Sequence, residues 1–356
     1  MSHDKIHWRT DTLRGTAIIA AGTLLIVLVL GAFFYSRLSF RPTHSIDVNL
    51  LAALEENTFP LLTVAPEESF RDLEFLRPIM NGKRIVALGE ATHGTREFFL
   101  MKHRLIEFLV YEMGFNLFAI EAGEPACSVI NRYVLEGKGN PLGAVLGFEY
   151  WTWQTEEVLD LVKWMRAHNS SSEAPCKLKF FGIDPIHGDR DNAMAHKVDE
   201  ILEREGKDSK ILVWAHNGHI SKQDDRFMGY KLCQRYSEQV YLLGFEFNEG
   251  EFTSRNAFGL KSHRIGPVTS QYYAFPLSSL STPLRFLDFK TMQTDDDLGE
   301  WLDAEWRSHS IDEMFYITQY SESWHTTTCP WSKSFDGVVF VKNSSKSRHL
   351  TNSFQH

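Results

Sequence analysis

The chain has 356 residues, a formal net charge of −9, 43% hydrophobic residues and 13% aromatic residues. This length is enough for one large domain or two modest ones. The acidic balance argues against a nucleic-acid-binding protein, because phosphate backbones require a basic surface. The four cysteines form no C-x-x-C pair, which disfavours zinc ribbons and thioredoxin-like sites. Their even number leaves both disulfides and scattered core thiols open.

An uncharged run of 20 residues occupies positions 16–35. A helix of about 20 apolar residues crosses the hydrocarbon core of a bilayer. The rival interpretation is a cleaved signal peptide, but its apolar region is normally about 7–15 residues long and ends at small residues. This run is longer and ends in Phe33, Phe34 and Tyr35. We therefore expect an uncleaved single-pass anchor in a membrane, and we expect the remaining protein to lie outside the cytoplasm.

From about residue 45 onward, short apolar runs alternate with amphipathic ones. The apolar runs predict strands at residues 84–89, 116–121, 178–183, 211–214, 240–244 and 337–342. Helical periodicity predicts a helix at 97–113 that ends at Gly114 and a helix at 156–167 that Thr155 caps. Strands that alternate with helices favour βαβ units. The expected fold class is therefore α/β, with a mainly parallel sheet flanked by helices and preceded by one N-terminal transmembrane helix.

The domain organisation follows from these patterns. We expect an N-terminal tail at 1–15, a transmembrane helix at 16–35, a linker at 36–74, a globular α/β domain at 75–342 and a polar, disordered tail at 343–356. Residues 260–299 mix Ser, Thr, Pro and Asp, which predicts a loop-rich stretch. The chain contains no internal repeat.

Acidic residues and histidines follow the first five predicted strands. They are Glu90 with His93, then Glu121, Asp184, His216 with His219, and Glu246. In open α/β sheets, ligands bind at the carboxyl ends of the strands. A single carboxylate at a strand end is usually a helix cap or a surface charge. Five strand ends in succession indicate instead that acids and bases converge on one edge, as an active site requires.

Glu90 and His93 lie in a glycine-flanked turn between a predicted strand and a predicted helix. Gly89 and Gly94 permit tight turns and the close approach of a ligand. A histidine can act as an acid or a base near neutral pH, and a nearby carboxylate can orient its ring and stabilise its charged form. The competing interpretation is a capping loop in which Glu90 only accepts hydrogen bonds from backbone amides.

His216 and His219 are three residues apart, so they can lie on one side of a turn. Together with Glu121 or Asp184 they could bind a metal ion. They could equally serve as a general acid and as hydrogen-bond donors to an oxyanion, or one of them could simply pack. The chain has no H-E-x-x-H motif of zincins and no G-x-S-x-G nucleophile elbow. If the protein is a hydrolase, water is therefore the expected nucleophile.

Several ordered segments resemble the signature of the erythromycin esterase family. They are LGEATHGTREFF at 88–99, KHRL at 102–105, AIEA at 119–122, YWTWQTEEV at 150–158, WAHNGH at 214–219, LGFEF at 243–247 and FDGVVF at 335–340. The resemblance runs from about residue 75 to 342, and it implies that this stretch is an erythromycin esterase-like hydrolase domain. It implies an α/β fold with a large cleft and hydrolysis of the macrolactone ester of macrolide antibiotics, an antibiotic-resistance activity.

Carried over residue by residue, the resemblance implies that His93 is the general base for water. Glu90 or Glu121 would orient His93 and balance its positive charge, while His216 and His219 would stabilise the oxyanion or protonate the leaving alkoxide. We add four candidate substrate-binding residues, namely Arg96, Trp151, Asp184 and Glu246. For Arg96, a plain role on the helix surface is the simpler interpretation.

Two alternative functions stay open. The first is a metal-dependent hydrolase that uses His93, Glu121, His216 and His219 as ligands, whereas the main hypothesis needs no cofactor and no metal. The second is a membrane-tethered protein that binds a flat aromatic ligand such as haem without turnover. The cluster of acids and histidines disfavours a pure binder, which needs few of them. The expected partners are a small ester or lactone substrate and the membrane, through residues 16–35, but no nucleic acid.

Overall fold

The structure is a computed structural model that describes residues 46–185, 188–292, 296–316 and 325–350. The predicted transmembrane helix at 16–35 lies outside the described residues. Among the residues that the structure does describe, no helix is long and apolar enough to cross a membrane.

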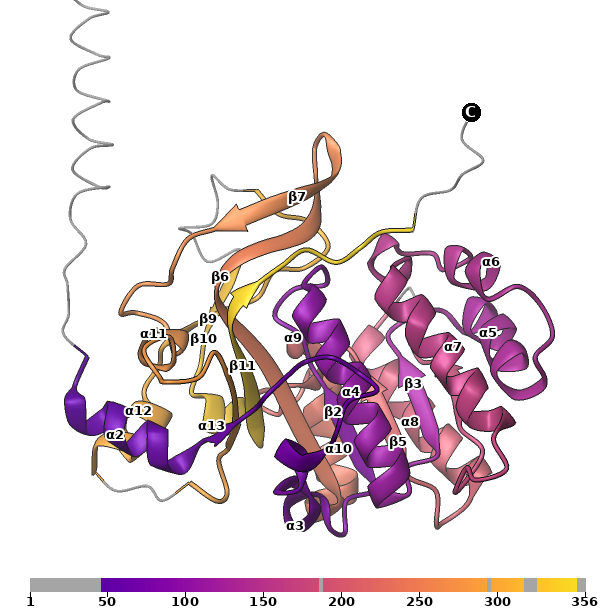
Figure 1. The fold of residues 1–356 in the computed structure, drawn as a ribbon, viewed down its shortest axis with the longest axis horizontal. Helices are drawn as coiled ribbons and strands as arrows, with labels where there is room; N and C mark the ends of the chain where they lie inside the picture. Colours follow the sequence, from indigo (N-terminus) through magenta and orange to yellow (C-terminus); the bar gives the residue numbers. More distant parts are fainter. Residues whose placement is uncertain (1–45, 186–187, 293–295, 317–324, 351–356) are drawn as a thin grey trace, which may run out of the picture. The chain divides into compact units, whose positions relative to one another are not determined.

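Within the described residues, nine strands form one large sheet in the order β1-β8-β11-β6-β2-β5-β3-β4, with β7 paired to β6 (Figure 1). Pairing is parallel from β11 across to β4, and antiparallel where β1, β7 and β8 join. The strands of this sheet are β1 Phe59–Pro60, β2 Ile85–Leu88, β3 Leu117–Ile120, β4 Lys179–Gly182, β5 Ile211–Trp214, β6 Val240–Asn256, β7 Gly259–Ile265, β8 Leu284–Asp288 and β11 Gly337–Ser344. A separate ribbon pairs β9 Arg307–His309 with β10 Thr326–Thr328.

The central strands are buried on both faces, and their side chains alternate between two apolar cores. In β2, Val86 and Leu88 belong to one core, while Ile85 and Ala87 belong to the other. All four of these residues are fully buried. This is the burial expected of a parallel sheet with helices on both sides, and it explains why the central strands have continuous apolar sequences.

Helices cover both faces of the sheet. The first core takes residues from α3 Leu76–Met80, α4 Arg96–Met113, α5 Glu124–Glu136, α6 Pro141–Leu146 and α7 Glu156–Ser170. The second takes residues from α2 Val48–Asn57, α8 Arg190–Glu205, α9 Asn217–Ile220, α10 Met228–Tyr236, α11 Ala274–Leu277, α12 Asp296–Asp303 and α13 Trp331–Ser334. Short 3-10 turns lie at η1 Arg71–Leu73, η2 Trp151–Trp153 and η3 Ser237–Gln239.

Local signals in the sequence located the C-terminal end of α4 and the N-terminal end of α7, whereas α7 extends to Ser170, beyond the predicted end at residue 167. Gly114 adopts a left-handed conformation with φ 72° and closes α4. The Thr155 side chain accepts a hydrogen bond from the backbone N–H of Val158 and caps α7. Both residues act through their immediate neighbours, so these predictions did not depend on the tertiary fold.

The prediction of a loop-rich stretch at 260–299 was right only in part. The stretch contains most of β7, then α11, β8 and part of α12. Strand β8 has a mixed sequence, but it lies between β1 and β11 and pairs with both. Neighbouring strands supply its backbone hydrogen bonds, and no local pattern in the sequence announces that pairing.

The tail was predicted to be disordered from residue 343, and this differs from the structure up to residue 350. Strand β11 continues to Ser344, and the next residues lie across the N-terminal ends of α4 and α7. The backbone N–H of Arg96 donates to the carbonyl of Ser345, and that of Glu156 donates to the carbonyl of Arg348. The segment accepts hydrogen bonds that the first turns of two helices would otherwise leave unmade.

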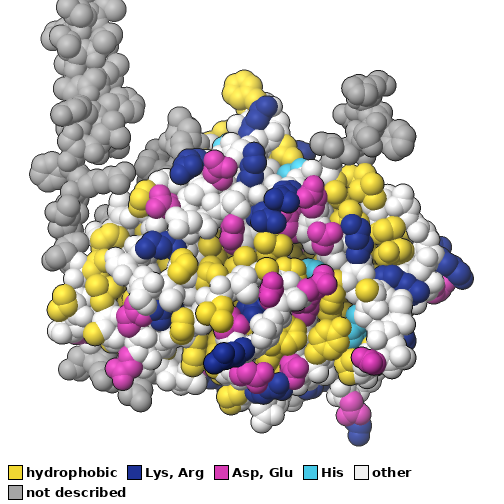
Figure 2. Space-filling model, viewed as in Figure 1, with side chains coloured by type: hydrophobic (Ala, Val, Ile, Leu, Met, Phe, Trp, Pro, Cys, Tyr) yellow, Lys and Arg dark blue, Asp and Glu magenta, His cyan; other side chains and the backbone are white. Residues whose placement is uncertain are grey.

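The surface carries both signs of charge. On the face shown in Figure 2, which is viewed as in Figure 1, acidic and basic side chains are interspersed around apolar patches. On that face the basic side chains do not gather into one broad area, in keeping with the net charge of −9.

Candidate active site

The loop between β2 and α4 brings Glu90 and His93 together. Nδ1 of His93 lies 2.6 Å from Oε1 of Glu90, and both side chains are buried. The loop is packed tightly against β6, because a Cβ atom at Gly94 would come within 1.8 Å of the carbonyl oxygen of Thr253. Only glycine fits there, and this close approach fixes the loop that orients the His93 ring.

The second oxygen of Glu90 is held by two further side chains. Oε2 lies 2.6 Å from Nζ of Lys102 on α4 and 2.9 Å from Nε1 of Trp214 at the end of β5. Burial by itself would raise the pKa of Glu90, but Lys102 and His93 bring it below its ordinary value. Burial also lowers the pKa of Lys102 to about 8, against the opposing effect of Glu90. These partners are side chains, not the backbone amides that the capping-loop interpretation requires.

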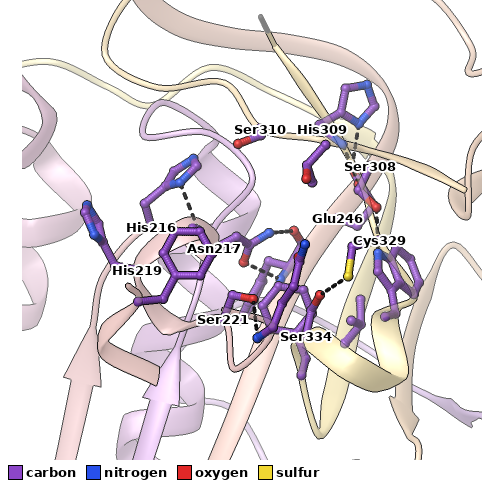
Figure 3. A pocket seen from close by; sticks show the side chains of 18 of the residues that line it. His216, Asn217, His219, Ser221, Glu246, Ser308, His309, Ser310, Cys329 and Ser334 are labelled. Carbon is purple, nitrogen blue, oxygen red and sulfur yellow. Dashed lines mark hydrogen bonds and ion pairs between the residues drawn. The ribbon is translucent and has the colours of Figure 1, made fainter. Parts of the chain in front are cut away.

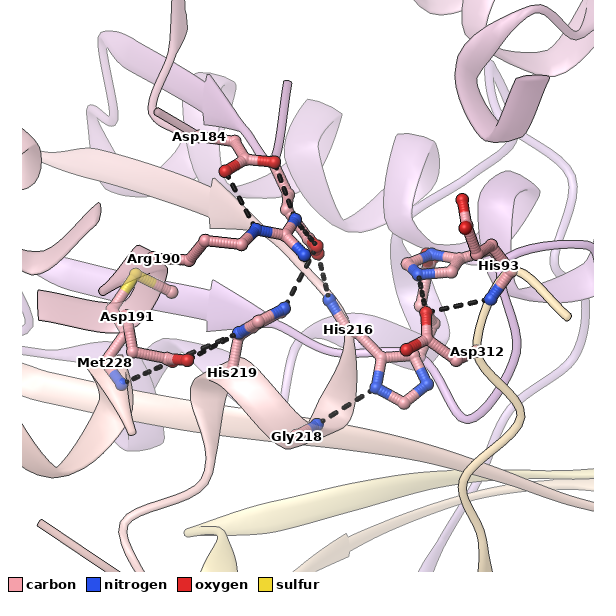
Figure 4. A network of polar contacts seen from close by, with 12 residues as sticks. His93, Asp184, Arg190, Asp191, His216, Gly218, His219, Met228 and Asp312 are labelled. Atoms are coloured by element: carbon pink, nitrogen blue, oxygen red, sulfur yellow. Dashed lines mark hydrogen bonds and ion pairs between the residues drawn. The ribbon is translucent and has the colours of Figure 1, made fainter. Parts of the chain in front are cut away.

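The other ring nitrogen of His93 faces a residue that the sequence did not single out. Nε2 lies 3.4 Å from Oδ1 of Asp312, in the segment that follows β9 (Figure 4). Burial alone would lower the pKa of His93, but Asp312 and Glu90, one at each ring nitrogen, raise it to about 10. In this conformation His93 is therefore an imidazolium ion.

Glu121, at the end of β3, is the centre of a second polar cluster. Its Oε1 lies 3.0 Å from Arg190 and 3.1 Å from Nε2 of His219, and its Oε2 accepts the backbone N–H of His216 (Figure 4). Nδ1 of His219 faces Asp191 at 3.0 Å. Burial lowers the pKa of His219, but Glu121 and Asp191 together raise it well above its ordinary value. Carboxylates therefore occupy both ring nitrogens of His219.

His216 differs from the other two histidines because no carboxylate contacts its ring. Its Nδ1 accepts the backbone N–H of Gly218 at 3.2 Å, which places the ring proton on Nε2. Among the residues that the structure describes, that buried Nε2 has no hydrogen-bond partner. Burial, with the charge of His93, lowers the pKa of His216 to about 4, so the ring is neutral. The ring centroids of His93 and His216 are 5.0 Å apart, which makes the Nε2–H a free donor beside His93.

Two cavities open beside this pair of histidines. A small one of about 130 Å³ is lined by His93, Glu121, Tyr150, Thr152, Trp153, Arg190, Asp312 and Glu313. A larger one of about 340 Å³ has His216 and His219 on its wall, together with aromatic, hydroxyl and thiol side chains (Figure 3). Asp312 lines both cavities. Polar groups with strongly shifted pKa values therefore converge on a hollow at the carboxyl ends of the strands.

The structure brings most of the predicted site residues to one place. Glu90, His93, Glu121, His216 and His219 all belong to the two linked clusters. Their catalytic roles stay predictions.

The four candidate substrate-binding residues divide into two pairs. Asp184 joins the site through Arg190, and Glu246 lines the large cavity while paired with His309 at 2.5 Å. Arg96 instead pairs with Glu157 on α7, which is the surface role that the sequence left open. Trp151 is buried against His349, and its neighbours Tyr150, Thr152 and Trp153 line the small cavity in its place.

Sequence reasoning missed Lys102, Arg190 and Asp312. Lys102 carried a signal, since a lysine on the apolar face of a predicted helix, one residue after Met101 and three before Leu105, calls for a buried partner. Arg190 lies only six residues after Asp184, its ion-pair partner, but no pattern in the sequence indicated that pairing. Asp312 carried no signal, because it reaches the site from a segment distant in sequence.

Among the described residues, no group of three or more His, Cys, Asp or Glu side chains is arranged to hold a metal ion. The carboxylates that such a site would use are already engaged, Glu90 by Lys102 and Trp214, and Glu121 by Arg190 and His219. The cysteines, all of which are described, are free thiols.

Comparison with known sequences identifies relatives of this chain. The sequence model of the family described as erythromycin esterase matches residues 110–188 and 185–344, which is more than half of the chain. Erythromycin esterase type II of Escherichia coli is 32% identical over 132 residues, covering 37% of this chain and 30% of the relative. The putative hydrolase YbfO of Bacillus subtilis is 34% identical over 122 residues, or 34% of this chain and 27% of the relative. The aligned regions thus span less than a third of these curated relatives.

Solved structures share the fold over most of the described protein. A succinoglycan biosynthesis protein gives a TM-score of 0.71 at 21% identity, covering 86% of this chain and 99% of the other. A Bacillus cereus protein gives 0.72 at 21% identity, with coverages of 86% and 100%. A mutant of erythromycin esterase EreC in its open conformation gives 0.59 at 16% identity, with coverages of 82% and 98%. These similarities establish a mixed α/β fold with a large sheet flanked by helices.

Proposed function

The chain belongs to the erythromycin esterase family, and on this premise we propose that it is a hydrolase that cleaves a carboxylic ester or lactone with water activated by His93. One observation carries the proposal. A histidine with a buried, firmly held carboxylate at Nδ1 has its ring centroid 5.0 Å from that of a second, neutral histidine, whose Nε2–H has no partner within the described part of the chain. A base and an oxyanion donor in this relation are what acyl transfer to water requires.

In the first step, water attacks the carbonyl carbon and gives its proton to Nε2 of a neutral His93. The Glu90 carboxylate accepts a hydrogen bond from the Nδ1–H of His93 and stabilises the imidazolium that forms. Lys102 and Trp214 keep the Glu90 carboxylate ionised and in place. The Nε2–H of His216 donates to the oxygen that becomes negative in the tetrahedral intermediate.

In the second step, the intermediate collapses and the bond to the leaving oxygen breaks. The proton held on Nε2 of His93 passes to that oxygen, so the products are a carboxylic acid and an alcohol, and His93 is neutral again. His219 does not serve as the acid here, because Glu121 and Asp191 occupy both of its ring nitrogens. Its role is to hold Glu121, which in turn accepts the backbone N–H of His216.

The decisive experiment measures hydrolysis by the full-length protein. The substrates are aryl esters, lactones and macrolides, since one relative is named an erythromycin esterase. We expect His93→Asn to lower kcat/KM by about 10²–10⁴, the usual contribution of general acid–base catalysis. His196→Asn, on an exposed position of α8, is the control and should match the wild type. Full activity of His93→Asn would disprove the mechanism.

We propose that the reaction needs no metal ion or other cofactor, because side chains already engage the carboxylates around His93. Hydrolysis should therefore be unchanged after exhaustive chelation and metal analysis of the preparation. A loss of activity that zinc or another divalent ion restores would instead support the metal-dependent alternative. Binding of haem or another flat aromatic ligand without turnover of any ester would support the binding-protein alternative.

We further propose that residues 16–35 anchor this hydrolase as a single-pass membrane protein, with the α/β domain outside the cytoplasm. The length and the lack of charge of that run support an anchor. The protein should stay with the membrane fraction after an alkaline wash, and protease added to intact cells or spheroplasts should digest its α/β domain. Recovery in the soluble fraction would contradict the anchor.

A further inference from the structure

Asp312 lies where the attacking water of the proposed reaction must approach His93. Its carboxylate lies 3.4 Å from Nε2 of His93, the atom that must take a proton from water. It also lines both the 130 Å³ cavity beside His93 and the 340 Å³ cavity beside His216. In this position Asp312 forms part of the wall of both cavities, and His93 faces a carboxylate where the reaction needs water.

We propose that Asp312 occupies the carboxylate subsite of this active site, where the acid product of hydrolysis binds, and that its side chain must swing out before His93 can act. The inference rests on the proposed function for its role in turnover. The subsite itself rests on the position of the Asp312 carboxylate beside His93 and in the wall of both cavities. A carboxylic acid is the one group that any ester or lactone hydrolysis leaves beside His93 and His216, and a carboxylate of this chain already occupies that place.

The contacts of Asp312 permit such a movement. Its side chain is 79% exposed, so water can solvate the carboxylate once it leaves. The backbone on either side is fastened independently. The N–H of Ile311 donates to the carbonyl of Ala91, and the carbonyl of Glu313 accepts from Arg255. A rotation of one side chain is therefore enough, and it breaks the contact with His93 and the 2.8 Å hydrogen bond that Oδ1 of Asp312 accepts from the backbone N–H of Glu313.

The surroundings of His93 favour a carboxylate at this subsite. Apart from Asp312, four titratable side chains surround His93, namely Glu90, Lys102, Glu121 and His216. Two more charged side chains, Arg190 and Glu313, line the small cavity with it. Glu90 and Lys102 form a closed pair, and Glu121 is engaged by Arg190 and His219. What faces the subsite is thus the imidazolium of His93 and the unpartnered Nε2–H of His216, a cation and a donor that suit an anion.

The experiment follows the titration of His93 by NMR in the full-length protein, with Asp312→Ala, Asp312→Asn and the control Glu200→Gln on α8. Burial lowers the pKa of His93, whereas Asp312 and Glu90 raise it, and the resulting pKa is about 10. Removing the Asp312 charge should lower that pKa by one unit or more in both variants, while Glu200→Gln leaves it unchanged. Adding acetate or butyrate to Asp312→Ala should raise the pKa again, because the free carboxylate fills the emptied subsite.

Activity gives the second measurement. Asp312→Ala should hydrolyse esters faster than the wild type at neutral pH, the acid limb of its pH–rate profile should move to lower pH, and butyrate should inhibit it. An unchanged pKa of His93 in Asp312→Ala, or no response of that pKa to added carboxylate, would overturn the subsite. A lowered pKa combined with lost hydrolysis would make Asp312 catalytic and overturn its role as an occupant that must leave. If no form of the protein hydrolyses any ester but the pKa responds as stated, the proposed function fails while the carboxylate subsite stands.

Discussion

The loop after β2 and the loop after β5 each carry a histidine to the same edge of the sheet, but their environments are opposite. His93 has a carboxylate at each ring nitrogen, and these raise its pKa to about 10 against the effect of burial. His216 has only the N–H of Gly218 at Nδ1 and nothing at Nε2, and burial lowers its pKa to about 4. Two residues of one type, with centroids 5.0 Å apart, are thus held in different protonation states.

The difference shows that the partners of a histidine, more than its burial, decide what it can do. Both rings are buried, so desolvation acts on both. A histidine paired with carboxylates can hold and return a proton, whereas a neutral one with a backbone donor at Nδ1 can only donate a hydrogen bond. A similar division between titratable neighbours assigns acid and base roles in other active sites.

The largest expected effect is a loss in the free energy of unfolding when the carboxylate of Glu90, beside His93, is removed. Glu90→Gln leaves the buried ammonium of Lys102 without its counter-charge, and breaking a buried ion pair typically costs about 3–5 kcal/mol. Urea unfolding should show that loss in the free energy of unfolding. The double variant Glu90→Gln with Lys102→Met should recover much of it, since no unpaired charge is then buried. Equal stability of Glu90→Gln and wild type would mean that the pair does not hold the loop.

A smaller effect is expected on the His216 side. His216→Phe keeps a ring of similar size but removes the Nε2–H, so we expect kcat to fall by roughly 10²–10³ with little change in KM. His216→Asn is the companion variant, because asparagine still caps α9 in place of the Nδ1 contact with Gly218. Steady-state kinetics that show no change in kcat for His216→Phe would remove the oxyanion donor from the mechanism.

The smallest effect should appear in the acid stability of the protein. The pKa of His216 is lowered in the folded state, chiefly by burial, so the unfolded chain binds the extra proton first as the pH falls. The neutral His216 contributes on the order of 2–3 kcal/mol to the free energy of unfolding for a pKa shift of this size. This contribution is complete above about pH 6.5 and is lost as the pH falls toward 4. Urea titrations between pH 7 and pH 4 should show a shallower loss in His216→Phe. The same slope in both proteins would contradict a neutral His216.

Much of the framework was readable from local patterns. The strands at 84–89, 116–121 and 211–214 were recognisable from short apolar runs, and the helices at 97–113 and 156–167 from periodicity and from the caps Gly114 and Thr155. Because parallel strands end at one edge of a sheet, the order of these elements along the chain was enough to predict that the acids and histidines after them meet there.

The pairing of strands and of charges was not readable in this way. Strand β8 depends on β1 and β11, and the segment at 345–350 depends on the helix ends that it covers, so neither has a signature of its own. The same holds for Arg96, which looked like a substrate ligand in the sequence but pairs with Glu157.

The sequence by itself indicated that Glu90, His93, Glu121, His216 and His219 gather at one sheet edge, because strands that alternate with helices run parallel and therefore end at the same edge. Only the tertiary structure decided which histidine is charged and which is neutral. That outcome depends on Lys102, Asp191 and Asp312. Each of them lies at least nine residues from the histidine that it influences, and electrostatic interactions act through space over a few ångströms regardless of separation along the chain.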